Sequence, residues 1–333
     1  MSDREQHRGQ QMQTDLSPAV ETFVRLARAG LSLPIPGHGQ TSQRFSALRA
    51  QAGADASVGR LFEAHTDAIA ILFEACVRPP SDAALAVWAS GPTSSARLEP
   101  KCDRFVLNGK RAFCGGATIV DAALLTVESP DGERLVLVDL KQAGVAIDPG
   151  IWKSESFRDA GISTVHFDNV HVDTASLIGP PGWYGGRLGF WFGAVGVAAL
   201  WAGMADSILA SLPALRRRCD DIALVATGSI EASMWAVSAL LDQAASQMDA
   251  TSALDDRVQR AKSIALCGRH TVRTHVESAI AAFDQEVGPA ALAFDPDLAR
   301  KRTELSMALA QTHGARDLIV LAQDEHAPRA RSV

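Results

Sequence analysis

The spacing of apolar residues changes twice along the chain. From residue 17 to about residue 85, apolar positions recur three and four residues apart, which is typical of amphipathic helices. Ser17-Pro18 matches a helix start, with a capping side chain followed by proline in the first turn. The LPIPGHGQ stretch interrupts these helices, and Arg78-Pro79-Pro80 ends them. The predicted buried stripes contain Phe45, Leu48, Ala52, Leu61, Ala64, Ala68 and Leu72.

The middle of the chain has short apolar runs separated by turn residues. Phe105–Leu107 leads into Asn108-Gly109, and Ala122–Val127 is followed by Asp131-Gly132, so both are predicted to be hairpins with tight turns. Residues 162–172 form a further predicted strand. Because the connections are too short for crossover helices, the pattern indicates a compact antiparallel β-domain.

The helical period returns at Gly182 and persists nearly to the end of the chain. Asp295-Pro296 is a predicted cap for the final helix. Together with the uncharged stretch 188–205, the periodic segments predict long helices that close as an antiparallel four-helix bundle. The apolar stripes of two of these helices contain Ile230, Met234, Val237, Leu241 and Met248, and Val258, Ala261, Ala265, Val272, Val276, Ala279 and Phe283.

The stretch 188–205 is apolar enough to raise the question of a membrane span. It is uncharged and carries Gly189 and Gly193 at the spacing that lets membrane helices approach closely. Its length is at the short edge of what a bilayer requires, and Asp206 follows it directly. We therefore interpret it as a buried central helix and expect no membrane span.

The predicted fold class is α+β, with an N-terminal helical region, a central antiparallel β-domain and a C-terminal four-helix bundle. The predicted boundaries are a lead-in at 1–15, the helical region at 16–85, the β-domain at 86–180, the bundle at 181–325 and a tail at 326–333.

Composition excludes several classes of function. The 333 residues are 47% hydrophobic, enough to bury a large core, and the net charge of −6 with scattered lysine and arginine gives no footprint for nucleic acid. Five cysteines with no close pair favour reduced thiols, and the polar first residues do not match a signal peptide, so we expect a cytoplasmic location.

Familiar nucleotide, hydrolase and metal motifs are missing from the sequence. Gly37-His38-Gly39 lacks the third glycine of a dinucleotide fingerprint, and neither a Walker loop nor a nucleophile elbow occurs. His166 and His171 are five apart on a predicted strand, which would put them on opposite faces, and His270 and His275 have a poor helical spacing for shared ligation. No metal site is expected.

Two stretches resemble the acyl-CoA dehydrogenase-like flavoproteins. They are FVLNGKRAFCGGATIVDAALLTV, which is similar to the family's strand, "LNG-K" turn and second strand, and FRDAGISTVHFDNVHVDTASLIGPPG, which is similar to its later "V-x-F-D-x-V-x-V … L-I-G" pattern. The resemblance implies FAD held between the β-domain and the bundle, a small-molecule substrate such as an acyl-CoA, and a homo-oligomer, either a dimer or a tetramer.

The resemblance also implies cofactor contacts. Trp88 and Ser90 take the place of the flavin-contacting loop, Phe113 that of the tryptophan packed on the flavin ring, and Gly115 that of a threonine or serine beside it. Arg217, or its neighbour Arg218, falls near the arginine that contacts the neighbouring subunit's FAD pyrophosphate, which a guanidinium can bind with two hydrogen bonds. Three of the family's cofactor contacts are eroded, because Gly91-Pro92 replaces Glu-Pro, Gly115 lacks a hydroxyl, and the glycine-rich stretch of the third bundle helix is absent. The alternative is that Trp88 and Phe113 are core residues and the arginines a solvated helix end.

The family's glutamate base, in a "Tyr-Glu-Gly-Thr" stretch, has no counterpart in the sequence. The last helical segment instead reads ELSMALAQTHGARDL, in which His313 follows Leu309 on the apolar stripe and is expected to face inward, with Asp317 placed to orient its imidazole. This segment resembles the "T-H" stretch of flavin-dependent monooxygenases on the same scaffold. A buried histidine without a catalytic role is the alternative.

Three hypotheses of function follow. The first is an FAD-dependent oxidoreductase that resembles acyl-CoA dehydrogenases and oxidises a CH–CH bond of an acyl thioester or a similar substrate. The second is a flavin-dependent monooxygenase or oxidase on the same scaffold. The third is a non-catalytic binding or scaffolding subunit that has lost its cofactor contacts.

Overall fold

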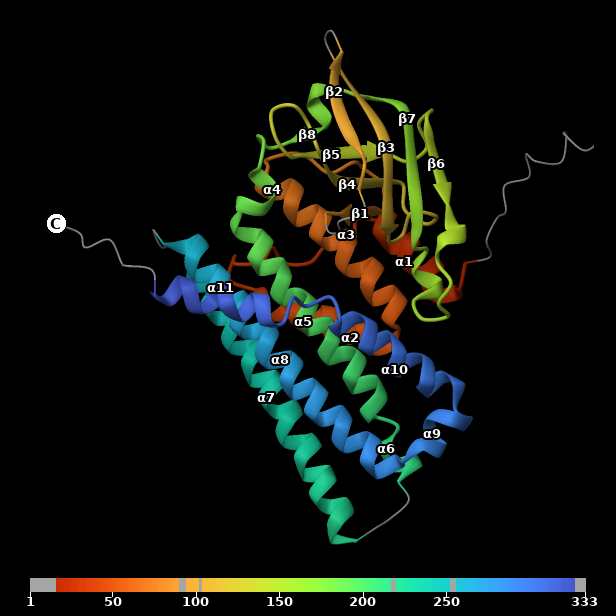
Figure 1. Cartoon of the computed structure of the whole chain (residues 1–333), viewed down its shortest axis with the longest axis vertical. Helices are drawn as coiled ribbons and strands as arrows, with labels where there is room; N and C mark the ends of the chain where they lie inside the picture. The colour runs from red at the N-terminus through yellow and green to blue at the C-terminus, as the bar shows by residue number, and fades with distance from the viewer. Residues whose placement is uncertain (1–15, 90–93, 102–103, 217–219, 252–255, 327–333) are drawn as a thin grey trace, which may run out of the picture.

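The computed structural model describes residues 16–89, 94–101, 104–216, 220–251 and 256–326 (Figure 1). A β-domain lies at one end of the molecule and long helices at the other, with the N-terminal helices between them (Figure 1). The predicted order of helical region, β-domain and helical bundle is confirmed.

The N-terminal region has three helices, α1 (Pro18–Arg28), α2 (Thr41–Ala54) and α3 (Ala56–Glu74). The Ser17 hydroxyl caps α1 by accepting a hydrogen bond from the Val20 N–H, as the sequence predicts. The LPIPGHGQ stretch lies between α1 and α2, so the predicted break is confirmed as well.

The β-domain consists of two four-stranded sheets, with strand orders β1-β4-β5-β8 and β2-β3-β7-β6. The strands are β1 (Leu85–Trp88), β2 (Arg97–Lys101), β3 (Arg104–Cys114), β4 (Ala122–Val127), β5 (Arg134–Asp139), β6 (Val145–Asp148), β7 (Ser163–Val172) and β8 (Leu177–Ile178). The pairings are antiparallel except that β1 pairs with β4 in parallel. The purely antiparallel expectation was wrong for that pair, because the intervening β2–β3 hairpin belongs to the other sheet and returns the chain in the same direction.

One of the two predicted hairpins is present. The β4–β5 hairpin is confirmed, with Gly132 in its turn at a φ of +118°. The other was wrong: β3 continues through Asn108 and Gly109, where its pairing with β7 shifts register. Gly109 has a φ of +107°, and a side chain there would meet the backbone of Ser95, so this Asn-Gly pair forms a bulge inside a strand.

The long helices of the bundle are α5 (Leu188–Leu209), α7 (Asp221–Thr251), α8 (Arg257–Val287) and α10 (Pro296–Leu309). The shorter helices are α4 (Trp183–Gly186), α6 (Leu212–Leu215), α9 (Pro289–Phe294) and α11 (Ala315–His326). Asp295 caps α10 as predicted, accepting from the N–H groups of Asp297 and Leu298 at 3.0 Å. Helix α5 lies in the middle, beside α2, α8 and α10 (Figure 1).

Two segments are long and apolar enough to cross a membrane by composition alone, Leu188–Leu215 and Asp221–Thr251. The most apolar window of the first is 67% buried within the protein, which confirms α5 as the predicted core helix. The corresponding window of α7 is only 22% buried, so α7 directs apolar residues away from the bundle.

Candidate functional site

Trp88 and Gly115, which the sequence assigns to one cofactor site, lie together in the structure. Trp88 ends β1 and is 4% exposed, and its indole N–H donates a hydrogen bond of 2.8 Å to the backbone carbonyl of Gly115, just after β3. A buried indole N–H requires an acceptor, so this bond fixes the ends of β1 and β3 against each other.

Phe113 has an unusual conformation at the end of β3. Its φ is +57°, a left-handed value that is unfavourable for a bulky aromatic residue, and its side chain is 61% exposed. The turn that follows is closed by a 3.1 Å hydrogen bond from the Gly115 N–H to the Phe113 carbonyl. Both the backbone strain and the exposure of a large apolar ring oppose folding, a combination found at functional sites.

The turn at Phe113–Gly115 is packed and hydrogen-bonded against the rest of the protein on one side. Cys114 is fully buried, and burial raises the pKa of its thiol to about 12, so the thiol stays protonated and inert. The Gly116 N–H donates a 2.7 Å hydrogen bond to the Ala160 carbonyl, and Leu61 of α3 packs against Gly116. Around Gly115, by contrast, a Cβ atom would meet no described atom within 4 Å. The turn therefore has one packed side and one open side.

These residues fit the flat ring of a flavin in one respect and not in another. Phe113 offers an exposed aromatic face, and the open side of Gly115 leaves space beside it. The Gly115 N–H and carbonyl are both used within the protein, so they contribute less hydrogen bonding to a ligand than the resemblance implies. Ser90 and Arg217, the remaining predicted cofactor contacts, lie outside the described residues, and their roles stay predictions.

The predicted position of His313 on an inward-facing helical stripe was wrong. Helix α10 ends at Leu309, and His313 is exposed in the turn before α11. Gly314, with a φ of +43°, breaks the helical period that the sequence pattern extends across this point. Asp317, in the first turn of α11, has no hydrogen bond to His313 among the described contacts. Its charge acts instead on Arg269, where burial lowers the pKa of the guanidinium and Asp317 opposes that shift.

The turn that carries His313 is held from the bundle side. The Arg273 guanidinium donates a hydrogen bond to the Thr312 hydroxyl and a second one, of 2.7 Å, to Glu277. The Thr312 hydroxyl in turn donates to the Leu309 carbonyl at 2.9 Å. The residue that precedes His313 is thus fixed, while the imidazole stays accessible.

A network of buried charges on α3 was missed by the sequence analysis. Glu63 is 7% exposed and pairs with Arg60 at 3.0 Å, while Asp67, one turn later, accepts a 2.7 Å hydrogen bond from Arg44 of α2. Burial, followed by the nearby Asp67 carboxylate, raises the pKa of Glu63 to about 7, although Arg60 and Arg44 oppose the shift. The spacing of Arg60, Glu63 and Asp67 was visible in the sequence. Glu63 becomes buried only when α2 packs against α3.

The network continues to the start of α5. Arg187, which is 8% exposed, pairs with Glu74 of α3, and the other Glu74 oxygen accepts a 2.9 Å hydrogen bond from the Gly189 N–H. The Arg187 guanidinium lies over the Tyr184 ring, 5.0 Å from its centroid. Burial raises the pKa of Tyr184 to about 12, so its phenol remains protonated.

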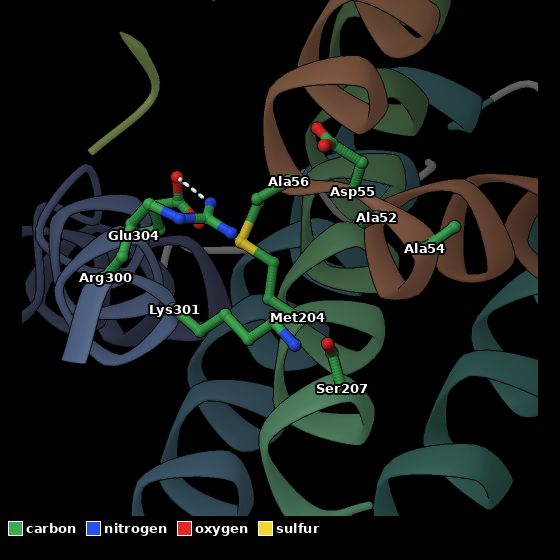
Figure 2. Close-up of a pocket in the computed structure, with 9 residues that line it drawn as sticks. All are labelled: Ala52, Ala54, Asp55, Ala56, Met204, Ser207, Arg300, Lys301 and Glu304. Atoms are coloured by element: carbon green, nitrogen blue, oxygen red, sulfur yellow. Dashed lines mark hydrogen bonds and ion pairs between the residues drawn. The ribbon is translucent and has the colours of Figure 1, made fainter. Parts of the chain in front are cut away.

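A small hollow lies where the α2–α3 junction, α5 and α10 meet (Figure 2). Three of its charged side chains are already engaged: Glu304, 1% exposed, accepts from Arg300 at 2.9 Å and from the Phe157 N–H at 3.0 Å. Lys301 pairs with Asp297 at 3.0 Å. These contacts connect the β-domain to α10. We therefore interpret the hollow as part of the packing between these two regions rather than as a ligand site.

The part of the chain that the structure describes contains no cluster of ligands suitable for a metal ion. His166 and His171 are both exposed on β7, so the expectation that they lie on opposite faces was wrong. Asn169, with a φ of +50°, introduces a bulge that shifts the alternation of the strand between them.

Comparison with known proteins identifies the scaffold. No family model matches the chain, and no curated protein matches it in sequence. Among solved structures, a dibenzothiophene monooxygenase from a Paenibacillus species, solved with FMN and indole, matches with a TM-score of 0.77 and 17% identity over 92% of this chain and 94% of that one. A nitrososynthase from Micromonospora carbonacea var. africana matches with a TM-score of 0.78 and 18% identity over 92% of this chain and 88% of that one. KijD3, solved with FMN and a dTDP-linked amino sugar, matches with a TM-score of 0.77 and 18% identity over 93% of this chain and 86% of that one. With its helical region, two-sheet β-domain and bundle in the same order, the chain has the acyl-CoA dehydrogenase-like fold, as its sequence resemblance implied.

Proposed function

We propose that this protein is a flavin-dependent oxidoreductase of the monooxygenase type that uses FMN. The observation that carries the proposal is the exposed, strained Phe113 at the junction of the β-domain and the helices, next to the open side of Gly115. This conformation is unfavourable for the isolated chain, and a bound molecule that covers the ring would offset its cost. The FMN complexes among structures of the same fold support a flavin as that ligand.

Each residue of the site has a proposed task. Phe113 stacks on the flavin ring, Trp88 holds the Gly115 backbone in place, and Arg217 binds the phosphate. When bound and reduced, a flavin supplies electrons to molecular oxygen. His313 serves as the general acid or base of the reaction, because an imidazole is suited to proton transfer and the turn keeps this side chain accessible.

Oxidation of an acyl thioester with FAD is the second candidate. It requires a base for the α-proton, and the turn between α10 and α11 carries His313 where that family has a glutamate. The absence of that family's glutamate stretch from the sequence favours the oxygenase.

The purified protein tests these candidates through its visible spectrum and through titration with FMN and FAD. We expect FMN to bind more tightly than FAD, with a perturbed flavin spectrum and quenching of flavin fluorescence. Preference for FAD together with bleaching by acyl-CoA in the absence of oxygen would favour the dehydrogenase. A colourless protein that takes up neither flavin would overturn both and leave the non-catalytic subunit.

We also infer that the protein works as a homo-oligomer in the cytoplasm. The outward-facing part of α7 supports the first part of this proposal, because Val225 and Trp235 are 72% and 74% exposed. The sequence-based expectation that the flavin is shared across a subunit interface is consistent with such contacts.

A further inference from the structure

Two strained phenylalanines flank one backbone hydrogen bond behind the turn at Phe113–Gly116, which is called the flavin turn below. The Gly116 N–H donates this 2.7 Å bond to the Ala160 carbonyl. Phe113 lies three residues before Gly116 and Phe157 three residues before Ala160, and their φ angles are +57° and +55°. Left-handed backbone is unfavourable for a bulky aromatic residue, so other contacts in the protein must hold each conformation.

The segment Phe157–Gly161, called the η2 segment below, forms the packed side of the flavin turn. The Phe157 carbonyl accepts a 3.0 Å hydrogen bond from the Ala160 N–H, which closes the 3-10 turn η2 (Arg158–Ala160). Gly161 lies so close to the residues after the flavin turn that a Cβ there would come within 2.7 Å of the Thr118 hydroxyl oxygen. On another side, η2 packs against α3. A displacement of the η2 segment would therefore displace the flavin turn as well.

A buried carboxylate of α10 holds the η2 segment from the bundle side. Glu304, which is 1% exposed, accepts a 3.0 Å hydrogen bond from the Phe157 N–H through Oε1. Arg300, one turn earlier on α10, donates to the same carboxylate at 2.9 Å and balances its charge (Figure 2). A hydrogen bond to a carboxylate is stronger than one between neutral groups, and this N–H is buried. Glu304 therefore stabilises the strained conformation of Phe157.

Helix α10 also connects the η2 segment to the turn that carries His313. One turn after Glu304, the Met307 sulfur accepts a weak hydrogen bond of 3.9 Å from the Ser154 hydroxyl, just before the η2 segment. Helix α10 then ends at Leu309, and His313 follows in the next turn. The same helix thus contacts the chain behind the flavin turn and leads to the proposed acid or base.

Packing alone does not require a charge at position 304. Burying a carboxylate removes it from water, and an apolar residue of similar size often gives equal or greater stability. A carboxylate differs from an apolar residue because it fixes one direction for the Phe157 N–H. The segment whose orientation is fixed in this way is the one that bonds Gly116.

We propose that Glu304 is a positioning residue for the flavin site. By accepting from the Phe157 N–H, it holds the η2 segment in the arrangement that bonds Gly116 and presents the Phe113 ring, and it does so without touching flavin or substrate. That the ligand on this ring is a flavin rests on the proposed function. Because coupling between two sites is reciprocal, a flavin that favours this arrangement also stabilises the hydrogen bond between Phe157 and Glu304.

The test measures the affinity of the purified full chain for FMN, or for FAD if that flavin binds more tightly, by quenching of flavin fluorescence. Glu304→Met keeps the approximate size of the side chain and removes the acceptor. We expect this variant to lose about tenfold in flavin affinity, the equivalent of one hydrogen bond to a charged group. Glu304→Gln keeps an acceptor oxygen for the Phe157 N–H without the charge, and should bind flavin within about threefold of the wild type.

Arg302→Ala is the matched control. Arg302 joins α10 to α8 by hydrogen bonds of 2.5 Å and 3.1 Å to Asp284, so this pair lies within the bundle. We expect Arg302→Ala to lower stability in urea and to leave flavin affinity and the flavin spectrum unchanged. Circular dichroism establishes that each variant is folded under the conditions of the titration.

Amide hydrogen exchange of the wild type is a second test that requires no variant to fold. Saturating flavin should slow exchange of the Phe157 and Gly116 N–H groups, whereas the Leu298 N–H, capped by Asp295 at the start of α10, should be unchanged. Equal flavin affinity in folded Glu304→Met, no recovery in Glu304→Gln, an equal loss in Arg302→Ala, or unchanged exchange at Phe157 would overturn the positioning role and leave the flavin proposal intact. Absence of flavin uptake by the wild type would overturn both.

Discussion

The indole N–H of Trp88 donates a 2.8 Å hydrogen bond to the backbone carbonyl of Gly115, so the end of β1 fixes the turn that follows β3. The two residues are 27 positions apart, and the strands beside them, β1 and β3, belong to different sheets. This bond makes the turn at Phe113 a defined surface rather than a free loop.

Replacing Trp88 with phenylalanine should weaken flavin binding without abolishing folding. The ring still fills the core, but the Gly115 carbonyl loses its donor, which corresponds to about 1 kcal/mol and hence about fivefold in affinity. Fluorescence titration with FMN measures the effect. An unchanged affinity in a folded variant would show that the Gly115 turn does not contribute to the flavin site.

Phe113→Gly should stabilise the protein and impair flavin binding. Glycine adopts the φ of +57° without strain and removes an exposed ring, so unfolding should become harder by about 1 kcal/mol. Flavin affinity should fall by about tenfold, because the stacking face is lost. Denaturant unfolding and FMN titration read the two quantities separately.

Phe157→Gly is the matched control for this variant. Phe157 has a similar φ of +55° but is 5% exposed, so glycine there loses core packing and should destabilise the protein by about 3 kcal/mol. If Phe113→Gly were destabilising to the same degree, its ring would be a packing element and the proposal for the site would fail.

The sequence predicted the layout of the fold better than the details of the site. Helical and strand periods depend on local spacing, so the order of the three regions and the cap at Asp295 were readable. Contacts between residues distant in sequence decide which sheet contains β2 and β3. The parallel β1–β4 pair and the bulge at Gly109 were therefore not predictable from the sequence pattern. His313 was misplaced because the apolar period runs across a turn that depends on Gly314.

The buried network illustrates a second limit. Arg60, Glu63 and Asp67 have the spacing of a solvated helix face, and only the packing of α2 and α5 places Glu63 in the interior. Burial of a charged residue depends on how the helices pack together, so a local sequence pattern does not predict it.

His313→Ala should lower turnover while leaving flavin binding intact. An imidazole that donates or accepts a proton in the rate-limiting step contributes about 10²–10⁴-fold. The measurement is flavin-dependent oxygen consumption coupled to product formation across a pH series, once a substrate is identified. His275→Ala, on α8, is the control and should keep full activity. Equal turnover in the two variants would remove His313 from the reaction.

Glu63 should make the stability of the protein fall as the pH rises toward neutrality. Unfolded, its carboxyl loses a proton near pH 4.5, whereas in the folded protein the pKa is raised to about 7. Between these values the folded state binds more protons than the unfolded state, so the free energy of unfolding decreases with pH and levels off above about 7. Glu63→Gln should flatten this slope, and Glu231→Gln, at an exposed position of α7, should retain it. Urea unfolding at several pH values measures the slope, and a slope of the same size in Glu63→Gln would assign it to other groups.

Trp235→Lys should convert the protein to a smaller assembly. Ile222, Leu224, Val225 and Trp235 of α7 are between 63% and 74% exposed, and a charge at Trp235 would have to be desolvated without a partner in an interface that covers it. Light scattering after gel filtration should show an oligomer for the wild type and a monomer, or a weakened equilibrium, for the variant. Phe294→Lys changes an equally exposed aromatic residue, 86% accessible on α9, and should leave the mass unchanged. A wild-type protein that is monomeric at high concentration would contradict the interface, and with it the expectation that a neighbouring subunit contributes to the flavin site.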